Sequence, residues 1–234
     1  MYKNFLIPFI FLFSLSLIIS SCNDKDEPEK DEPVYEGVVI NGVRWATYNL
    51  ASHGTFVENP EDFGGLFQWG RRGDGHEQHD SPTTTELSTS DVPSHGNFIT
   101  ASNHPRDWRS PQNDNLWANP KTVNDPCPQG WRVPTLDELQ TLDDTRNVTS
   151  EWTIVNDVSG RIFTDINSNN TLFLPAAGWR VQNNGALDNV GTHGYYWSSI
   201  VIGTDARNLS FSSSNVVVGN NLRTWGFSVR CVAD

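Results

Sequence analysis

The chain has 234 residues, a hydrophobic fraction of 36% and a formal net charge of −12. This length is sufficient for one domain with a sizeable core. A chain this acidic repels phosphate backbones, so the composition argues against nucleic acid as a partner.

The N-terminal residues have the pattern of a targeting segment. Lys3 supplies a positive start, and residues 5–19 are almost continuously apolar but too few for a comfortable membrane span. The sequence Ile19-Ser20-Ser21-Cys22 resembles a bacterial lipobox. We expect residues 1–21 to be a lipoprotein signal peptide, with Cys22 carrying lipid such as palmitate. The alternative is an ordinary secretory signal with a chance cysteine.

The residues that follow read as an acidic linker. Residues 23–36 contain seven acids and two lysines, for a net charge of −5, and almost nothing that could be buried. We expect residues 22–36 to form a disordered tether. Acids directly after a lipidated cysteine resemble the surface-export signal of Bacteroides-type lipoproteins, which implies a lipid-anchored protein exposed on the outer membrane. Without Lys3 and the tether, residues 37–234 carry a net charge of −8.

The first half of the domain combines one hairpin with a long irregular stretch. Two extended runs, 38–40 and 43–47, flank Asn41-Gly42, which is a strong hairpin signal. Residues 51–126 are rich in Gly, Pro, Asn, Asp, Ser and Thr and show no lasting periodicity. Their scattered aromatic residues predict an ordered, loop-rich layer pinned to the core.

Residues 127–135 organise the middle of the chain. Pro128 and Gly130 mark a turn, and residues 131–133 predict a brief strand. Thr135 with Glu138 three residues later forms a capping-box pattern at the start of a helix. Once Cys22 is lipidated, Cys127 and Cys231 are the one remaining pair of thiols in an exported protein, so we expect them to form a disulfide.

The second half predicts further antiparallel strands. Residues 161–164 and 171–174 form a second hairpin pattern, and a Gly/Asn-rich loop covers 182–194. Three extended runs complete the chain: Tyr195–Ile202, Asn208–Val218 and Gly226–Val232.

Three sequence motifs resemble the Fibrobacter succinogenes major paralogous domain family, over roughly residues 37–234. They are Asp125-Pro126-Cys127-Pro128-Gln129-Gly130-Trp131-Arg132-Val133-Pro134-Thr135, Gly194-Tyr195-Tyr196-Trp197-Ser198-Ser199 and the final run from Gly226 to Val232. The resemblance implies an α+β, C-type-lectin-like fold with antiparallel hairpins, one or two short helices and extensive ordered loops, distantly like the formylglycine-generating enzyme domain. It also implies that the first and last strands lie side by side.

No candidate catalytic or metal site emerges from the residues. Both cysteines stand where the resemblance implies a structural bridge, and the sugar-binding triplets Glu-Pro-Asn and Trp-Asn-Asp do not occur. Residues 165–170 resemble the start of an EF-hand loop but lack its glycine and its final acid, and Asn/Asp clusters also form ordinary hairpin turns. His76, His79 and Asp80 offer zinc ligands, but a solvated loop is the favoured interpretation. We therefore predict no enzyme activity and no cofactor.

The sequence predicts a non-catalytic surface protein that binds an extracellular glycan or protein through its C-terminal loops. An accessory subunit of a surface appendage is the alternative, and a formylglycine-generating-type enzyme is the least favoured. Of the C-terminal aromatics Trp179, Tyr195, Tyr196, Trp197, Trp225 and Phe227, most are expected in the core and one or two could stack on sugars. For the run 200–225, a plain Ser/Asn-rich edge hairpin is the favoured interpretation, and a variable ligand-contacting surface is the alternative. The predicted ligand contacts are Asn183, Asn184, Asp205, Arg207, Asn215, Asn220, Asn221, Arg223 and Trp225.

Overall fold

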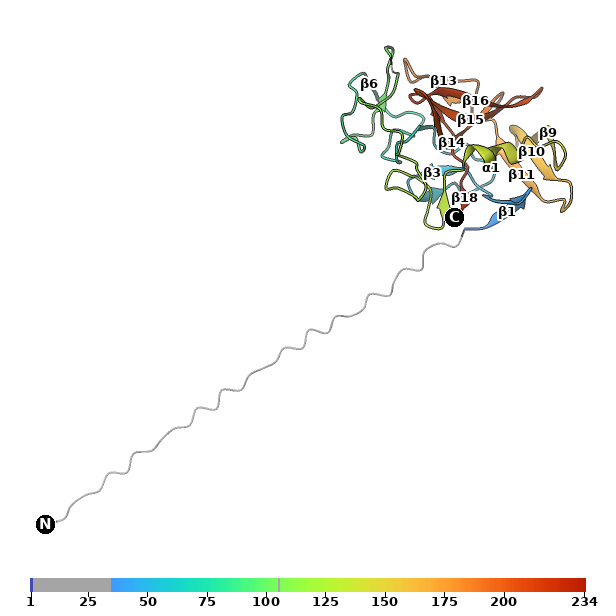
Figure 1. The fold of residues 1–234 in the computed structure, drawn as a ribbon, viewed down its shortest axis with the longest axis horizontal. Coiled ribbons are helices and arrows are strands. Elements are labelled where there is room, and N and C mark those ends of the chain that lie inside the picture. Colours follow the sequence, from blue (N-terminus) through green and yellow to red (C-terminus); the bar gives the residue numbers. More distant parts are fainter. Residues whose placement is uncertain (2–34, 105) are drawn as a thin grey trace. The chain divides into compact units, whose positions relative to one another are not determined.

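The computed structural model describes Met1, residues 35–104 and residues 106–234 (Figure 1). One compact unit runs from Tyr35 to Asp234. Tyr35 belongs to it, because its ring packs edge-on against Phe56 at a centroid distance of 4.6 Å. The predicted signal peptide, Cys22 and nearly all of the tether lie outside the described residues. No helix in the described part of the chain is long and apolar enough to cross a membrane.

The expected α+β, C-type-lectin-like fold class is wrong, because the protein is β-rich. The described residues contain eighteen strands and a single six-residue helix, α1 (Leu136–Thr141). The capping box is present as predicted: the Thr135 backbone N–H donates to the Glu138 carboxylate at 2.7 Å, and the Glu138 N–H donates to Thr135 Oγ1. The helix is only six residues long, because the chain turns at residues 142–147. A strand that the sequence had not indicated begins directly afterwards, at Val148.

The N-terminal hairpin lies against the last strand, as the resemblance implied. Both turn residues, Asn41 and Gly42, have positive φ values of 46° and 81°, which this tight turn requires. The last strand joins the hairpin through the pair Val232–Trp45. The sheet has the order β1-β2-β18-β8, with β1 (Gly37–Ile40), β2 (Val43–Ala46), β8 (Trp131–Arg132) and β18 (Val232–Ala233).

Two three-stranded antiparallel sheets form most of the second half. The first has the order β11-β10-β9, with β9 (Val148–Val155), β10 (Val158–Asp165) and β11 (Thr171–Pro175). The second has the order β14-β15-β16, with β14 (Gly194–Ile202), β15 (Asp205–Phe211) and β16 (Val216–Leu222). The predicted single run 208–218 is therefore wrong, because a turn at 212–215 divides it between β15 and β16.

The β14-β15-β16 sheet separates two hydrophobic cores. Trp197 and Ala206 belong to one cluster, whereas Tyr196 and Leu209 belong to the other. Neighbouring residues of a strand point to opposite faces, so this assignment follows from the pleat. The first cluster also takes up buried aromatics of the loop-rich layer, as predicted for that layer: Phe67, Trp69, Trp108 and Trp117.

A fourth sheet, of order β13-β12-β17-β5, consists of very short strands. They are β5 (Phe67–Gln68), β12 (Trp179–Arg180), β13 (Leu187–Asp188) and β17 (Gly226–Phe227). The final run 226–232 is thus not one strand, because β17 and β18 belong to different sheets. Two further pairs are β3 (Leu50–Ser52) with β4 (Thr55–Phe56), and β6 (Thr83–Thr84) with β7 (Phe98–Ile99).

The predicted disulfide is present. Cys127 and Cys231 are bonded, with their Cα atoms 6.1 Å apart and 104 positions apart in the sequence. Both residues are buried in the first core cluster. The bond therefore ties the turn before β8 to the residue before β18.

We predict that replacing both cysteines by alanine lowers the free energy of unfolding by about 2–5 kcal/mol, because the unfolded chain loses a long cross-link. Urea unfolding of the double variant against the oxidised wild type measures this difference. Equal midpoints for the two proteins would contradict the prediction.

Candidate functional site

Three aromatic side chains gather where the β13-β12-β17-β5 sheet meets β14. Trp179 lies on β12, Tyr195 lies on β14, and Trp225 directly precedes β17; all three are half-buried. The Trp179 ring meets Tyr195 at a centroid distance of 4.9 Å and Trp225 at 6.0 Å, both edge to face. We call these three residues the aromatic platform. The buried Phe227 lies 4.7 Å from Tyr195 and 6.2 Å from Trp225, so it supports the platform from the core.

The pleat of β12 explains why Trp179 is on this face. Arg180, the next residue, points to the opposite face and is buried, with its guanidinium 4.3 Å from the centre of the Phe98 ring. Gly226 pairs with Arg180 across the ladder. A Cβ atom at Gly226 would lie 2.9 Å from the Arg180 Cβ, so a glycine lets β17 approach β12 and places Trp225 beside Trp179.

Polar groups surround the platform. Asp188 is exposed and stands opposite Trp179 in the β12–β13 ladder, which puts both side chains on one face. The His193 ring is half-buried, 5.9 Å from the Trp179 ring. Burial raises the pKa of Tyr195, so its hydroxyl remains protonated and able to donate at neutral pH. The site thus combines apolar ring surface with a carboxylate, an imidazole and a phenol.

The nine predicted contacts do not converge on one concave site. Trp225 alone belongs to the platform, and the other eight are distributed as follows. Asn183 and Asn184 are exposed in the loop after β12, and Asn215 is exposed in the β15–β16 turn. Asp205, Arg207 and Asn220 share one face of their sheet, with Asn220 donating to Asp205 at 2.6 Å, whereas Asn221 points to the other face and accepts from Asn208.

Arg223 is a core residue, which corrects its prediction as a ligand contact. It is fully buried, donates to the Asp114 carboxylate at 2.7 Å and to the Gly203 carbonyl at 3.0 Å, and lies over the Trp69 ring. Its Nη1 is 3.7 Å from Asp107 Oδ2, an ion pair beyond hydrogen-bond distance. Burial raises the pKa of Asp107 while Arg223 opposes that rise.

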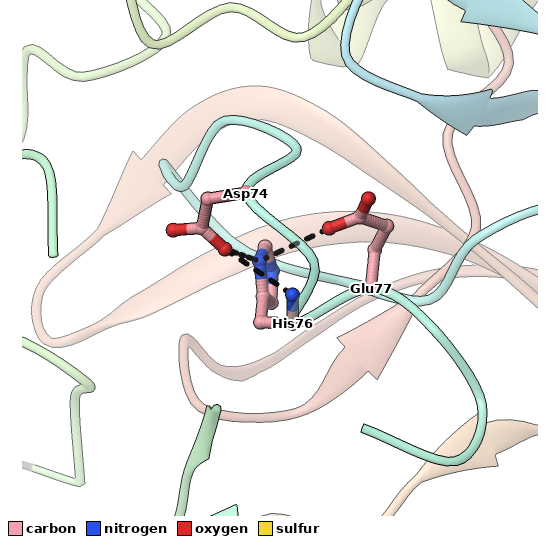
Figure 2. Close-up of side chains that lie close together, drawn as sticks. All are labelled: Asp74, His76 and Glu77. Atoms are coloured by element: carbon pink, nitrogen blue, oxygen red, sulfur yellow. Dashed lines mark hydrogen bonds and ion pairs between the residues drawn. The ribbon is translucent and has the colours of Figure 1, made fainter. Parts of the chain in front are cut away.

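The residues Asp74, His76 and Glu77 are the one group in the described part of the chain whose ligand atoms lie close enough to hold a metal ion (Figure 2). His76 Nδ1 is 2.7 Å from Asp74 Oδ1 and 3.4 Å from Glu77 Oε2. However, the Gln68 backbone N–H donates to His76 Nε2 at 3.0 Å, which places the ring proton on Nδ1. A metal at Nδ1 would displace that proton. Because Nε2 accepts a hydrogen bond and carries no proton either, the ring would have to become an anionic imidazolate. Arg71 also donates to Asp74 at 2.8 Å, so the group is better explained as a buried hydrogen-bond network.

The other metal patterns of the sequence are also explained by local hydrogen bonds. His79 Nε2 bonds the Gly64 carbonyl at 2.9 Å, away from His76. The solvated-loop interpretation fails for His76, which is fully buried. In the EF-hand-like turn, Asp165 accepts from the backbone N–H groups of Asn41, Asn167 and Ser168, and these bonds lower its pKa. The Asp165 carboxylate therefore stabilises the turn to which it belongs.

Two clefts lie away from the platform. One, of about 350 Å³, is lined by Ala51, Ser52, Gly64, Gly65, Glu77, Gln78, His79 and Asp80. The other, of about 410 Å³, is lined by Asn41, Asp137, Gln140, Thr141, Asp143, Asp144, Arg146 and Val218. Both are acidic and open, and neither is lined by a Trp, Tyr or Phe side chain, so the platform is the stronger candidate for a binding site.

Sequence reasoning named all three platform residues as aromatics but did not separate them from the core. Tyr196, Trp197 and Phe227 are buried, as expected for most of that cluster. The missed signal was the alternation Trp179-Arg180: an arginine buried on one face of a two-residue strand leaves the tryptophan on the other.

A family model described as a domain of unknown function (DUF8237) matches residues 144–232, a range that contains the platform. No curated protein matches the chain. No solved structure matches it either.

We predict that His76 remains neutral down to acidic pH. Burial lowers its pKa from 6.5 to about 3. Between these two pH values the unfolded chain binds a proton at this histidine and the folded protein does not. The stability linked to His76 is therefore complete above pH 6.5 and is lost as the pH falls towards 3. NMR of the ring nitrogens should show the Nδ1–H form, unchanged between pH 7.5 and 4.5. A histidine-like titration near pH 6.5, or a shift on adding zinc, would contradict this network.

We also predict that Arg223→Ala destabilises the fold by about 3–5 kcal/mol, because it leaves Asp107 buried without its cation. The half-buried Arg207 gives the matched control, and Arg207→Ala should change stability by less than about 1 kcal/mol. Chemical unfolding of both variants measures the difference. Equal losses of stability in the two variants would contradict the assignment of Arg223 to the core.

Proposed function

We propose that this domain is a non-catalytic carbohydrate-binding module of a surface-anchored lipoprotein, and that the aromatic platform is its binding site. The observation that carries the proposal is the edge-to-face arrangement of Trp179, Tyr195 and Trp225 beside Asp188 and His193. The surface location rests on the lipobox at Cys22, which lies outside the described residues.

Carbohydrates suit such a surface for a chemical reason. A pyranose ring has an apolar C–H face, which packs against an aromatic ring, and a rim of hydroxyl groups that donate and accept hydrogen bonds. Asp188 supplies an acceptor, His193 a donor or acceptor, and the Tyr195 hydroxyl a donor. Together these groups can satisfy the rim while the rings cover the apolar face.

The fold holds the platform rigidly, which supports binding without a large entropic cost. The Trp179 ring packs edge-on against Tyr195 and Trp225, and these two rings pack at a tilt against Phe227. Trp179 is fixed further by the ladder of β12 with β13 and β17. The loop after β13 is held by the Gly178 N–H, which donates to the His193 carbonyl at 2.8 Å. Side chains that are ordered before binding lose little freedom on binding.

We predict that a fragment spanning residues 35–234 binds one or more of immobilised β-glucan, chitin and mucin glycans. Trp225→Ala should weaken that binding by about 1–3 kcal/mol, roughly 5- to 150-fold, because it removes a stacking face. Titration of the corresponding oligosaccharide measures the affinity.

Trp152→Ala provides the matched control, because Trp152 is another half-buried tryptophan, located on β9 against the second core cluster. It should lower stability without changing the affinity. No binding to any of these glycans, or equal losses in both variants, would count against the proposal.

A further inference from the structure

Strand β16 is an open edge of the β14-β15-β16 sheet. All seven of its residues pair with β15 one to one, from Val216 with Phe211 to Leu222 with Asp205, without a bulge. No other strand in the described ranges pairs with it. The opposite edge strand, β14, is occupied: the Trp197 N–H donates to the Ser228 carbonyl and the Ser199 N–H to the Pro134 carbonyl.

This edge lacks the features that normally prevent strands of different molecules from pairing. Such features are charges, prolines, bulges or very short strands. The sequence Val-Val-Val-Gly-Asn-Asn-Leu of β16 has no charge and no proline. The other long edge strand, β9, carries the exposed Glu151 near its middle, and β1 is only four residues long.

Strand β16 and its neighbour β15 form a surface without net charge, although residues 37–234 carry a net charge of −8 and Val218 of β16 lines the acidic cleft beside α1. Val217 is 45% exposed on one face of this sheet, and Ile202, two strands away, is 43% exposed on the other face. The adjacent strand β15 contains one acid and one base, Asp205 and Arg207. Two copies of an acidic protein repel one another least where such a neutral surface meets its own equivalent.

We propose that β16 pairs antiparallel with β16 of a second copy of this chain, around a two-fold axis at Gly219, to form a continuous six-stranded sheet. In this register Val216 faces the partner's Leu222, which pairs two apolar side chains at each end. Gly219 faces its own equivalent on the axis. A two-fold axis is the commonest symmetry of soluble oligomers, and pairing satisfies backbone groups along both edges.

Charge substitution at the axis tests the proposal. A Cβ atom at position 219 has no neighbour nearer than Asn208 Oδ1, at 3.8 Å, so side chains fit there. G219K and G219E each place like charges directly opposite one another, whereas an equimolar mixture pairs opposite charges. Sedimentation velocity of residues 35–234, from about 1 to 200 µM, should show a wild-type dimer, at least about fivefold weaker association of each variant alone, and recovery in the mixture.

Ile166→Lys is the matched control, because Ile166 is 46% exposed in a turn outside the strands, and it should leave the dimer unchanged. Gly219→Cys should also form a disulfide-linked dimer on mild oxidation faster than Ser213→Cys, which lies in the exposed β15–β16 turn. A wild-type protein that stays monomeric throughout, a dimer unaffected by either charge, or equal cross-linking at both positions would overturn the proposal. These readouts involve no glycan, so they stand apart from the test of the platform.

Discussion

Buried backbone carbonyls in the loop-rich layer impose the main constraint on this fold. The long stretch 51–126 contains only short strands, so ladder hydrogen bonds satisfy few of its carbonyl groups. Buried guanidinium groups supply the missing donors. Within this stretch Arg71 donates to two backbone carbonyls and Arg180 to three. Arg230 donates to two carbonyls elsewhere, those of Ala46 and Phe173, and each of the three arginines is at most 2% exposed. A guanidinium offers five N–H groups in a fixed plane, which suits several loops meeting at one point.

These buried cations also determine where the platform can form. Arg180 links β12 to residues 76–81 and to Gly185, so the inner face of β12 is occupied by its guanidinium. Trp179 must then lie on the outer face, next to Trp225. Burial lowers the pKa of Arg230 to about 10, which still leaves it protonated at neutral pH, bonded to neutral oxygens of Asn49, Ala46 and Phe173. Loop anchoring and site construction therefore share one physical cause.

Local patterns predicted local structure well and long-range structure poorly. The Asn41-Gly42 hairpin, the Thr135–Glu138 capping box and the disulfide all depend on short motifs or on counting cysteines, and all are present. The fold class was wrong because the α+β class was implied by the resemblance alone, whereas the described residues contain eighteen strands and one six-residue helix. The predicted ligand contacts do not form one site, partly because Asn220 and Asn221 are neighbours on one strand and their side chains point to opposite faces. Burial of Arg223 depends on Asp107 and Asp114, more than a hundred positions away, which no local pattern reveals.

The edge of β16 is joined to the platform through its own sheet, because Tyr195 lies on β14, and the two features would act together. A single platform of three rings offers limited contact area, and stacking on one sugar gives modest affinity. Two copies joined through β16 would carry two platforms on one rigid body, so a repeating glycan bound at the first would meet the second at a high effective concentration. The gain requires that both sites reach one glycan chain simultaneously. A neutral edge on an acidic domain is thus consistent with selection for pairing, since a single lysine on that strand would have been sufficient to block it.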